Sequence, residues 1–99
     1  MSAAGEQGSV TVRLYTAPGC CLCEAMGAQL EDLRAEFPLV VEEINIAGDS
    51  ELERRFREQI PVLYLNGRKT AKYRLSTAAL RQRIERALGR SGRGGWRLR

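Results

Sequence analysis

Apolar and polar residues alternate near the start of the chain, and farther along the apolar residues recur every three or four positions. The alternation over 10–15 predicts a β-strand. The wider spacing that follows predicts a helix over 21–37. Its apolar stripe comprises Leu22, Met26, Leu30, Leu33 and Phe37. Pro38 is expected to end this helix, because proline disfavours helical geometry in the residue before it.

A second strand is predicted over 39–46, followed by a short polar helix. Ser50 is expected to be the N-cap of that helix, because Glu53 stands three residues later and completes a capping box. Leu52 and Phe56 form its apolar pair at helical spacing. The middle of the chain therefore predicts one strand and one short helix.

Asn66-Gly67 is the plainest turn signal in the chain. The pair supplies the two positive-φ positions of a type I′ turn, so it predicts a hairpin between strands over 62–65 and 68–74. Ser76 is expected to cap a last helix, and Gly89 is expected to follow that helix's end. The apolar stripe of this helix comprises Leu80, Ile84 and Leu88.

The predicted order of elements is β-α-β-α-β-β-α. A parallel pair of strands followed by a hairpin makes a mixed four-stranded sheet flanked by helices, which is an α/β fold. We expect one folded domain over 9–89. The composition of 1–8 and of 90–99 predicts a flexible N-terminus and a flexible basic C-terminal tail.

The net charge of +4 comes from the end of the chain. Residues 90–99 hold four of the 16 basic residues and no acid, so 1–89 hold 12 basic residues against 12 acidic ones. A neutral domain gives nucleic-acid binding little electrostatic support, so we expect no nucleic-acid partner. No secretory signal and no membrane-length apolar run is visible, so we expect a cytoplasmic monomer with no membrane contact.

Cys20 and Cys23 stand three residues apart at the junction of the first strand and the first helix. Free backbone N–H groups and the helix dipole favour the thiolate form of a cysteine in the first turn of a helix. Two cysteines at this spacing lie on one helix face and can close a disulfide. The pair therefore predicts reversible dithiol chemistry, with Cys20 as nucleophile and Cys23 as resolving thiol.

The segments Tyr15–Glu24 and Ile60–Leu63, together with the element order, resemble the small glutaredoxin-like proteins of the thioredoxin superfamily. The resemblance covers about 9–89 and implies a thioredoxin-like fold and a thiol–disulfide oxidoreductase. It also implies a cis peptide bond between Ile60 and Pro61, facing the cysteines. The backbone of Ile60 would then pair with an extended substrate.

Two departures from glutaredoxins concern glutathione. Ala17 stands where they carry a lysine, and 71–75 lack their Gly-Gly and Asp. No bound cofactor is expected, and glutathione remains a possible cosubstrate whose carboxylates Arg68, Lys69 or Lys72 could meet. The expected partners are disulfide-containing or glutathionylated proteins, with glutathione or a reductase as electron donor.

Two other functions stay open at this point. Cys21 could join the other two cysteines as a third sulfur for a soft metal or an iron–sulfur cluster, although our prediction for metal is none. The arginine tail, with Trp96, could instead serve a nucleic-acid adaptor, although a solvated extension is our prediction for it. Tyr15 and Tyr64 are expected to be structural aromatics rather than substrate contacts.

Overall fold

The computed structural model describes residues 9–92, and their side chains as far as Gly89. The predicted flexible N-terminus (1–8) and most of the predicted tail, including Trp96, lie outside the described residues. The elements follow the order β-α-β-α-β-β-α, as expected from the sequence.

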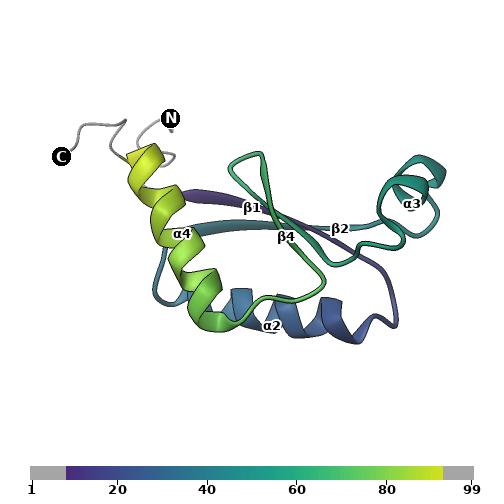
Figure 1. Ribbon diagram of the computed structural model, residues 1–99, viewed down its shortest axis with the longest axis horizontal. Helices are drawn as coiled ribbons and strands as arrows, with labels where there is room; N and C mark the ends of the chain where they lie inside the picture. The colour runs from purple at the N-terminus through teal and green to yellow at the C-terminus, as the bar shows by residue number, and fades with distance from the viewer. Residues whose placement is uncertain (1–8, 93–99) are drawn as a thin grey trace.

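In the described part of the chain, four strands form one mixed sheet in the order β2-β1-β3-β4 (Figure 1). Their bounds are Val10–Thr16 for β1, Leu39–Asn45 for β2, Val62–Leu65 for β3 and Arg68–Lys72 for β4. Strand β1 runs parallel to β2 and antiparallel to β3, which runs antiparallel to β4. The parallel pair followed by a hairpin confirms the predicted sheet.

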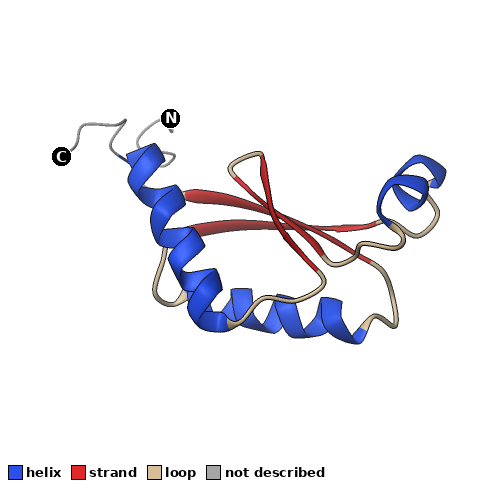
Figure 2. Ribbon diagram, viewed as in Figure 1, coloured by secondary structure: helices blue, strands red, loops and turns tan. Residues whose placement is uncertain are grey.

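The helices among residues 9–92 are α2 (Cys21–Arg34), α3 (Ser50–Phe56) and α4 (Thr77–Gly92). Helices α2 and α4 lie on one face of the sheet, and α3 lies at one end of it (Figure 2). Within 9–92, no helix is long and apolar enough to cross a membrane.

The main core lies between the sheet and the helices α2 and α4. Strand β1 places alternate side chains in it, and they are completely buried. Its buried members are Val10, Val12, Leu14, Met26, Leu30, Leu33, Leu39, Leu63, Leu65, Leu80, Ile84 and Ala87. Burial of a Val, Leu or Ile side chain stabilises a fold by roughly 1.5–3 kcal/mol, so this cluster fixes both helices on the sheet.

A second, smaller core holds α3 against the sheet. Phe56 is 3% exposed and packs with Ile46 and Val62. The ring of Tyr15 stacks on Phe56 with centroids 4.4 Å apart, and Tyr64 meets Tyr15 edge to face at 5.7 Å. Both tyrosines are therefore structural aromatics, as predicted.

Two predicted helix ends were wrong. Helix α2 ends at Arg34 rather than at Phe37. The chain tightens into turns before Pro38 is reached, because the amide of Glu36 donates to Leu33 O at 2.9 Å. Helix α4 runs past Gly89 to Gly92, because Gly89 does not adopt the positive φ of a helix-ending glycine.

The predicted N-cap of α3 was also wrong by one residue. Asp49, not Ser50, is the N-cap, and its carboxylate accepts hydrogen bonds from the amides of Glu51 and Leu52, both at 3.1 Å. Glu53 still folds back, and it accepts from the amide of Gly48 at 3.2 Å. The predicted cap Ser76 is confirmed, since its hydroxyl accepts from the amide of Ala79 at 3.1 Å.

The hairpin turn is confirmed. Asn66 and Gly67 both have positive φ, 51° and 84°, as a type I′ turn requires. Strand β4 ends at Lys72 rather than at the predicted Arg74. The chain leaves the strand at Tyr73, whose φ of 69° is incompatible with an extended strand.

Candidate active site

Cys20 is the N-cap of α2, directly after a turn in which Gly19 has a φ of 78°. This turn brings the chain from the end of β1 to the start of the helix. The Sγ atom of Cys20 accepts a hydrogen bond from the amide of Cys23 at 3.1 Å. The same amide would stabilise negative charge on this sulfur in the reduced protein.

Cys20 and Cys23 form a disulfide, with their Cα atoms 5.1 Å apart. Cys23 is 4% exposed, whereas Cys20 is only half-buried. An attacking disulfide or thiol from outside can therefore reach Cys20 more easily than Cys23. The nucleophile and resolving-thiol roles stay a prediction, and the exposure of Cys20 is the property that a nucleophile would need.

Cys21 is exposed and is the free cysteine. It lies on the first turn of α2 but takes no part in the disulfide. Within the part of the chain that the structure describes, no group of three His, Cys, Asp or Glu side chains is arranged to hold a metal ion. The disulfide uses Cys20 and Cys23 and leaves Cys21 outside it.

The peptide bond between Ile60 and Pro61 is cis, as the resemblance implied. Val62, which follows Pro61, pairs with Tyr15 near the end of β1. Ile60 and Ala17 both pack against the cluster around Phe56. The Ile60–Pro61 turn therefore lies at the end of the sheet from which the cysteine loop starts.

The backbone of Ile60 makes no hydrogen bond with another residue in 9–92. Its amide and carbonyl groups are thus available to an extended polypeptide, which is how added strands are bound. Pro61 is buried and its carbonyl accepts a hydrogen bond from the amide of Tyr73 at 2.9 Å. The turn is thereby fixed to the residue that follows β4.

Tyr73 belongs to this site, and the sequence did not reveal it. Its hydroxyl donates a hydrogen bond to Glu58 O at 2.8 Å, and the residue is 43% exposed. The ammonium group of Lys72 lies over the Tyr73 ring, 5.4 Å from its centroid. A non-glycine residue at positive φ is uncommon and tends to mark functional segments. The sequence shows that 71–75 lack the Gly-Gly pair of glutaredoxins. It does not show that Tyr73 adopts the positive φ that favours glycine.

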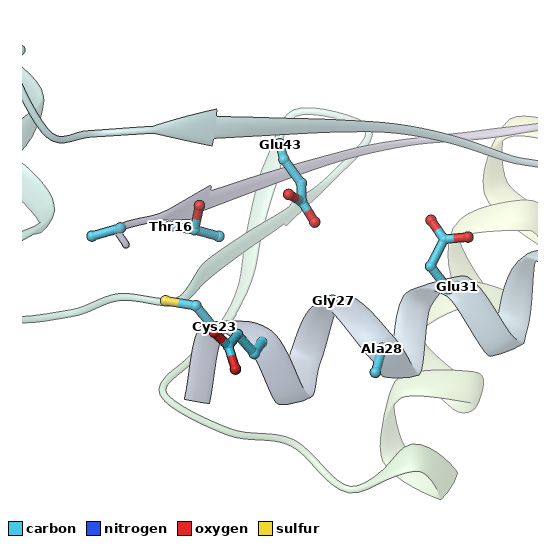
Figure 3. A pocket seen from close by; sticks show the side chains of 8 residues that line it. Thr16, Cys23, Gly27, Ala28, Glu31 and Glu43 are labelled. Atoms are coloured by element: carbon cyan, nitrogen blue, oxygen red, sulfur yellow. The ribbon is translucent and has the colours of Figure 1, made fainter. Parts of the chain in front are cut away.

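A hollow of about 290 Å³ opens beside Cys23, between α2 and the ends of β1 and β2 (Figure 3). Its lining residues are Thr16, Ala17, Cys23, Glu24, Gly27, Ala28, Glu31 and Glu43. Figure 3 shows Glu43 extending from the sheet toward the helix and Glu31 extending from the helix toward the sheet. Carboxylates and the buried sulfur share one solvent-accessible space, through which water could carry a proton from a Cys23 thiol.

The three cations that could meet glutathione lie at different distances from this site. Arg68 pairs with Leu65 beside the hairpin turn, at the opposite end of the sheet. The ammonium group of Lys69 donates to Gln59 Oε1 at 2.8 Å. Gln59 directly precedes Ile60, and Lys72 lies beside Tyr73, so both lysines lie closer to the Pro61 turn than Arg68 does.

Comparison with solved structures shows which fold the chain adopts. The fold superimposes with a TM-score of 0.63 on a thioredoxin from Halobacterium salinarum, 19% identical over 86% of this chain and 79% of that one. Chloroplastic thioredoxin z gives a TM-score of 0.66 at 16% identity, over 83% and 80% of the two chains. The protein has a thioredoxin-like fold.

Comparison with family models identifies the protein more specifically than the fold does. Residues 11–85 match the family described as Glutaredoxin-like domain (DUF836), and the chain belongs to that family. A solution structure of a protein from Nitrosomonas europaea is 28% identical, with a TM-score of 0.64 over 76% of this chain and 91% of that one. An uncharacterized protein of Mycobacterium tuberculosis is 30% identical over 77% of this chain and 84% of its own length.

Proposed function

We propose that this protein is a thiol–disulfide oxidoreductase that reduces protein disulfides or glutathione mixed disulfides through Cys20 and Cys23. The observation that carries the proposal is the disulfide at the start of α2, with one half-buried and one buried sulfur. Membership of the glutaredoxin-like family supports it. The cis Ile60–Pro61 turn at the same end of the sheet supplies a backbone for substrate pairing.

The reaction takes place in two exchanges. In the first, the Cys20 thiolate attacks one sulfur of a substrate disulfide, forms a mixed disulfide with it and releases the other substrate sulfur as a thiolate. In the second, Cys23 loses its proton and attacks Cys20 Sγ. The Cys20–Cys23 disulfide forms, and the second substrate sulfur leaves as a thiolate.

Each turnover moves two electrons from the protein to the substrate, so an external reductant must restore the two thiols. Glutathione is one such donor, and two molecules of it would become one glutathione disulfide. A flavoenzyme reductase is the other. A reducing compartment such as the cytoplasm suits this cycle.

The amide of Cys23 has a defined part in the first exchange. It donates to Cys20 Sγ in the disulfide, at 3.1 Å. Once the disulfide opens, the same donor faces a full negative charge, and charged hydrogen bonds are roughly twice as strong as neutral ones. The amide therefore stabilises the Cys20 thiolate more than the oxidised sulfur, which helps Cys20 both to attack and to leave.

An equilibrium titration in glutathione redox buffers tests the proposal. Samples are quenched with acid, alkylated and mapped by peptide mass. We expect a reversible Cys20–Cys23 disulfide at a defined potential, or a glutathione adduct on Cys20. The Cys21→Ser variant is the matched control, because it removes the exposed thiol outside the disulfide, and its titration curve should coincide with that of the unmodified protein.

Two results would contradict the proposal. Cysteines that stay reduced over the whole range would show that the pair is not redox-active. Oxidation that requires Cys21 and yields only covalent dimers would show that the exposed thiol, not the Cys20–Cys23 pair, is the reactive one.

A further inference from the structure

A second hollow, of about 210 Å³, lies between β4 and α4. Its lining residues are Leu65, Arg68, Lys69, Thr70, Arg83 and Arg86. The neighbouring hairpin turn contacts the start of β1, since the amide of Asn66 donates to Thr11 O at 2.8 Å. Cys20 follows the other end of β1, so roughly 20 Å of strand separates this hollow from the disulfide.

Within residues 9–92, no carboxylate forms an ion pair with the arginines that line this hollow. Among the described residues, the ion pairs within 4.0 Å use the arginines 13, 34, 54 and 81, and none uses Arg68, Arg83 or Arg86. None of the described residues that line the hollow is acidic. The ammonium group of Lys69 is engaged by Gln59. Three arginines therefore line one small space with no carboxylate among its described lining residues, and an anion placed there would be attracted by all three.

The geometry of β4 holds one of these arginines in place. The register of the β3–β4 pairing shifts after Leu63, which pairs with Ala71 while Tyr64 pairs with Lys69, so Thr70 is an extra residue in a β-bulge. The carbonyl oxygen of Thr70 accepts a hydrogen bond from Arg83 Nη1 at 3.1 Å.

Arg83 is half-buried, and Arg86 lies three residues farther along the same face of α4. An arginine ordered in advance lowers the entropy cost of binding an anion.

We propose that this hollow, which we call the three-arginine site (Arg68, Arg83 and Arg86), binds a phosphate group. Guanidinium groups bind phosphate oxygens in a bidentate fork, which suits three of them around one tetrahedral anion. The hollow is smaller than the roughly 300–1,000 Å³ of a typical site for a drug-sized ligand. It therefore suits free phosphate, or the phosphate of a larger molecule whose remainder stays outside. The site is independent of the thiol chemistry proposed above.

The test is a nuclear magnetic resonance titration of the ¹⁵N-labelled full chain at low ionic strength. Inorganic phosphate is added in one arm and adenosine monophosphate in the other, with chloride at matched ionic strength as the reference. We expect saturable amide shifts at 68–70, 83 and 86, and none of them with chloride. The double variant Arg83→Gln/Arg86→Gln should bind at least ten times more weakly.

Arg54→Gln/Arg57→Gln is the matched control, since it removes the same charge from the region of α3 and should leave the affinity unchanged. Arg68→Gln is a second variant of the site that leaves the Arg83–Thr70 hydrogen bond intact, and it should also weaken binding.

Tighter binding of adenosine monophosphate than of phosphate would identify a larger phosphorylated ligand, and equal affinities would identify free phosphate. Non-saturable shifts in both arms, or an equal loss in the control variant, would overturn the proposal and show general charge attraction only.

Discussion

The carboxylate of Glu43 on β2 lies against the backbone of Gly27 on α2, one helical turn after Cys23. A Cβ atom on Gly27 would be 3.2 Å from Glu43 Oε2. The register explains this contact, because Glu43 pairs with Leu14, a buried residue of β1, and so lies on the sheet face that α2 covers. Gly27 thus leaves room for a charged side chain beside the disulfide.

Replacement of Gly27 by Ala should stabilise the protein. Glycine in a helix interior is less favourable than alanine by about 0.5–1 kcal/mol. Glu43 is exposed, so the flexible end of its side chain can move away from the new methyl group. We expect Gly27→Ala to raise the free energy of unfolding by up to about 1 kcal/mol in urea denaturation. A loss of stability that Glu43→Ala reverses would show instead that Glu43 is held rigidly.

Replacement of Cys23 by Ser should trap the first intermediate of the proposed reaction. Without the second sulfur, a mixed disulfide on Cys20 has no internal thiol to resolve it. Treated with glutathione disulfide, Cys23→Ser should accumulate a mixed disulfide that joins one glutathione to Cys20 and releases the other glutathione as a thiol, measured as intact mass after acid quench and located by peptide mass mapping. Cys20→Ser should form no such adduct. An adduct found on Cys21 would contradict the assignment of Cys20 as nucleophile.

Replacement of Tyr73 by Gly should change the use of glutathione more than the stability. Glycine adopts the φ of 69° without strain, but the substitution removes the ring and the hydrogen bond from its hydroxyl to Glu58 O. Because glutaredoxins carry Gly-Gly in this segment, we expect Tyr73→Gly to reduce glutathione mixed disulfides several-fold faster than the unmodified protein. Turnover assays with a glutathionylated peptide measure this rate.

Tyr73→Phe is the control, because it keeps the ring beside Pro61. It should leave the rate unchanged and cost about 0.5–1.5 kcal/mol of stability through the lost hydrogen bond. Equal rates in the glycine variant and the unmodified protein would show that the ring does not limit access to the site.

The pair between Glu36 and Arg81 should stabilise the protein at neutral pH and lose its effect in acid. The hydrogen bond from Arg81 lowers the pKa of Glu36 from 4.5, its charge adds to this effect, and burial opposes it. A carboxylate whose pKa is lower in the folded state contributes stability above its unfolded pKa, which is lost as the pH falls through the folded value. Glu36→Gln should therefore be less stable at pH 7.

The difference between Glu36→Gln and the unmodified protein should shrink below about pH 4.5. Urea midpoints measured from pH 7 to pH 3 test this expectation. Arg81→Gln should show the same loss, and the double variant should lose no more than either alone. A difference that is constant over the whole pH range would exclude the ion pair as its cause.

The N-cap of α3 offers a direct comparison of two neighbouring residues. Asp49 accepts hydrogen bonds from two amides of the first turn, whereas Ser50 stands inside the helix. Asp49→Ala should therefore cost about 0.5–2 kcal/mol of stability. Ser50→Ala should be close to neutral, because alanine is the better helix former. Thermal or urea unfolding distinguishes the two, and a larger loss for Ser50→Ala would restore Ser50 as the cap.

Local patterns predicted the order of the elements, because each rests on residues close together in the chain. Asn66-Gly67 defined the hairpin through backbone preferences alone. The two cysteines also define their site locally, three residues apart at a helix start. The cap of α3 was wrong because Asp49 and Ser50 are both good caps, and only the three-dimensional structure shows which side chain faces the free amides.

Contacts between distant segments were not predictable in the same way. The close approach of Glu43 to Gly27 depends on the register between β1 and β2. That register cannot be read from the sequence of either strand alone. The β-bulge at Thr70 and its hydrogen bond to Arg83 depend on where α4 crosses β4. Tyr73 at positive φ likewise reflects the Pro61 turn that it contacts, not its own preference.

The position of α4 has a practical consequence for handling this protein. The described chain enters the fold at the start of β1 and leaves it at the end of α4, and both points lie at the end of the sheet away from the start of α2 (Figure 1). An affinity tag, a fluorophore or a solid support attached beyond either point would stand on the far side from Cys20. Immobilised protein should therefore still present its disulfide to large polypeptide substrates, which makes surface capture of mixed-disulfide partners feasible.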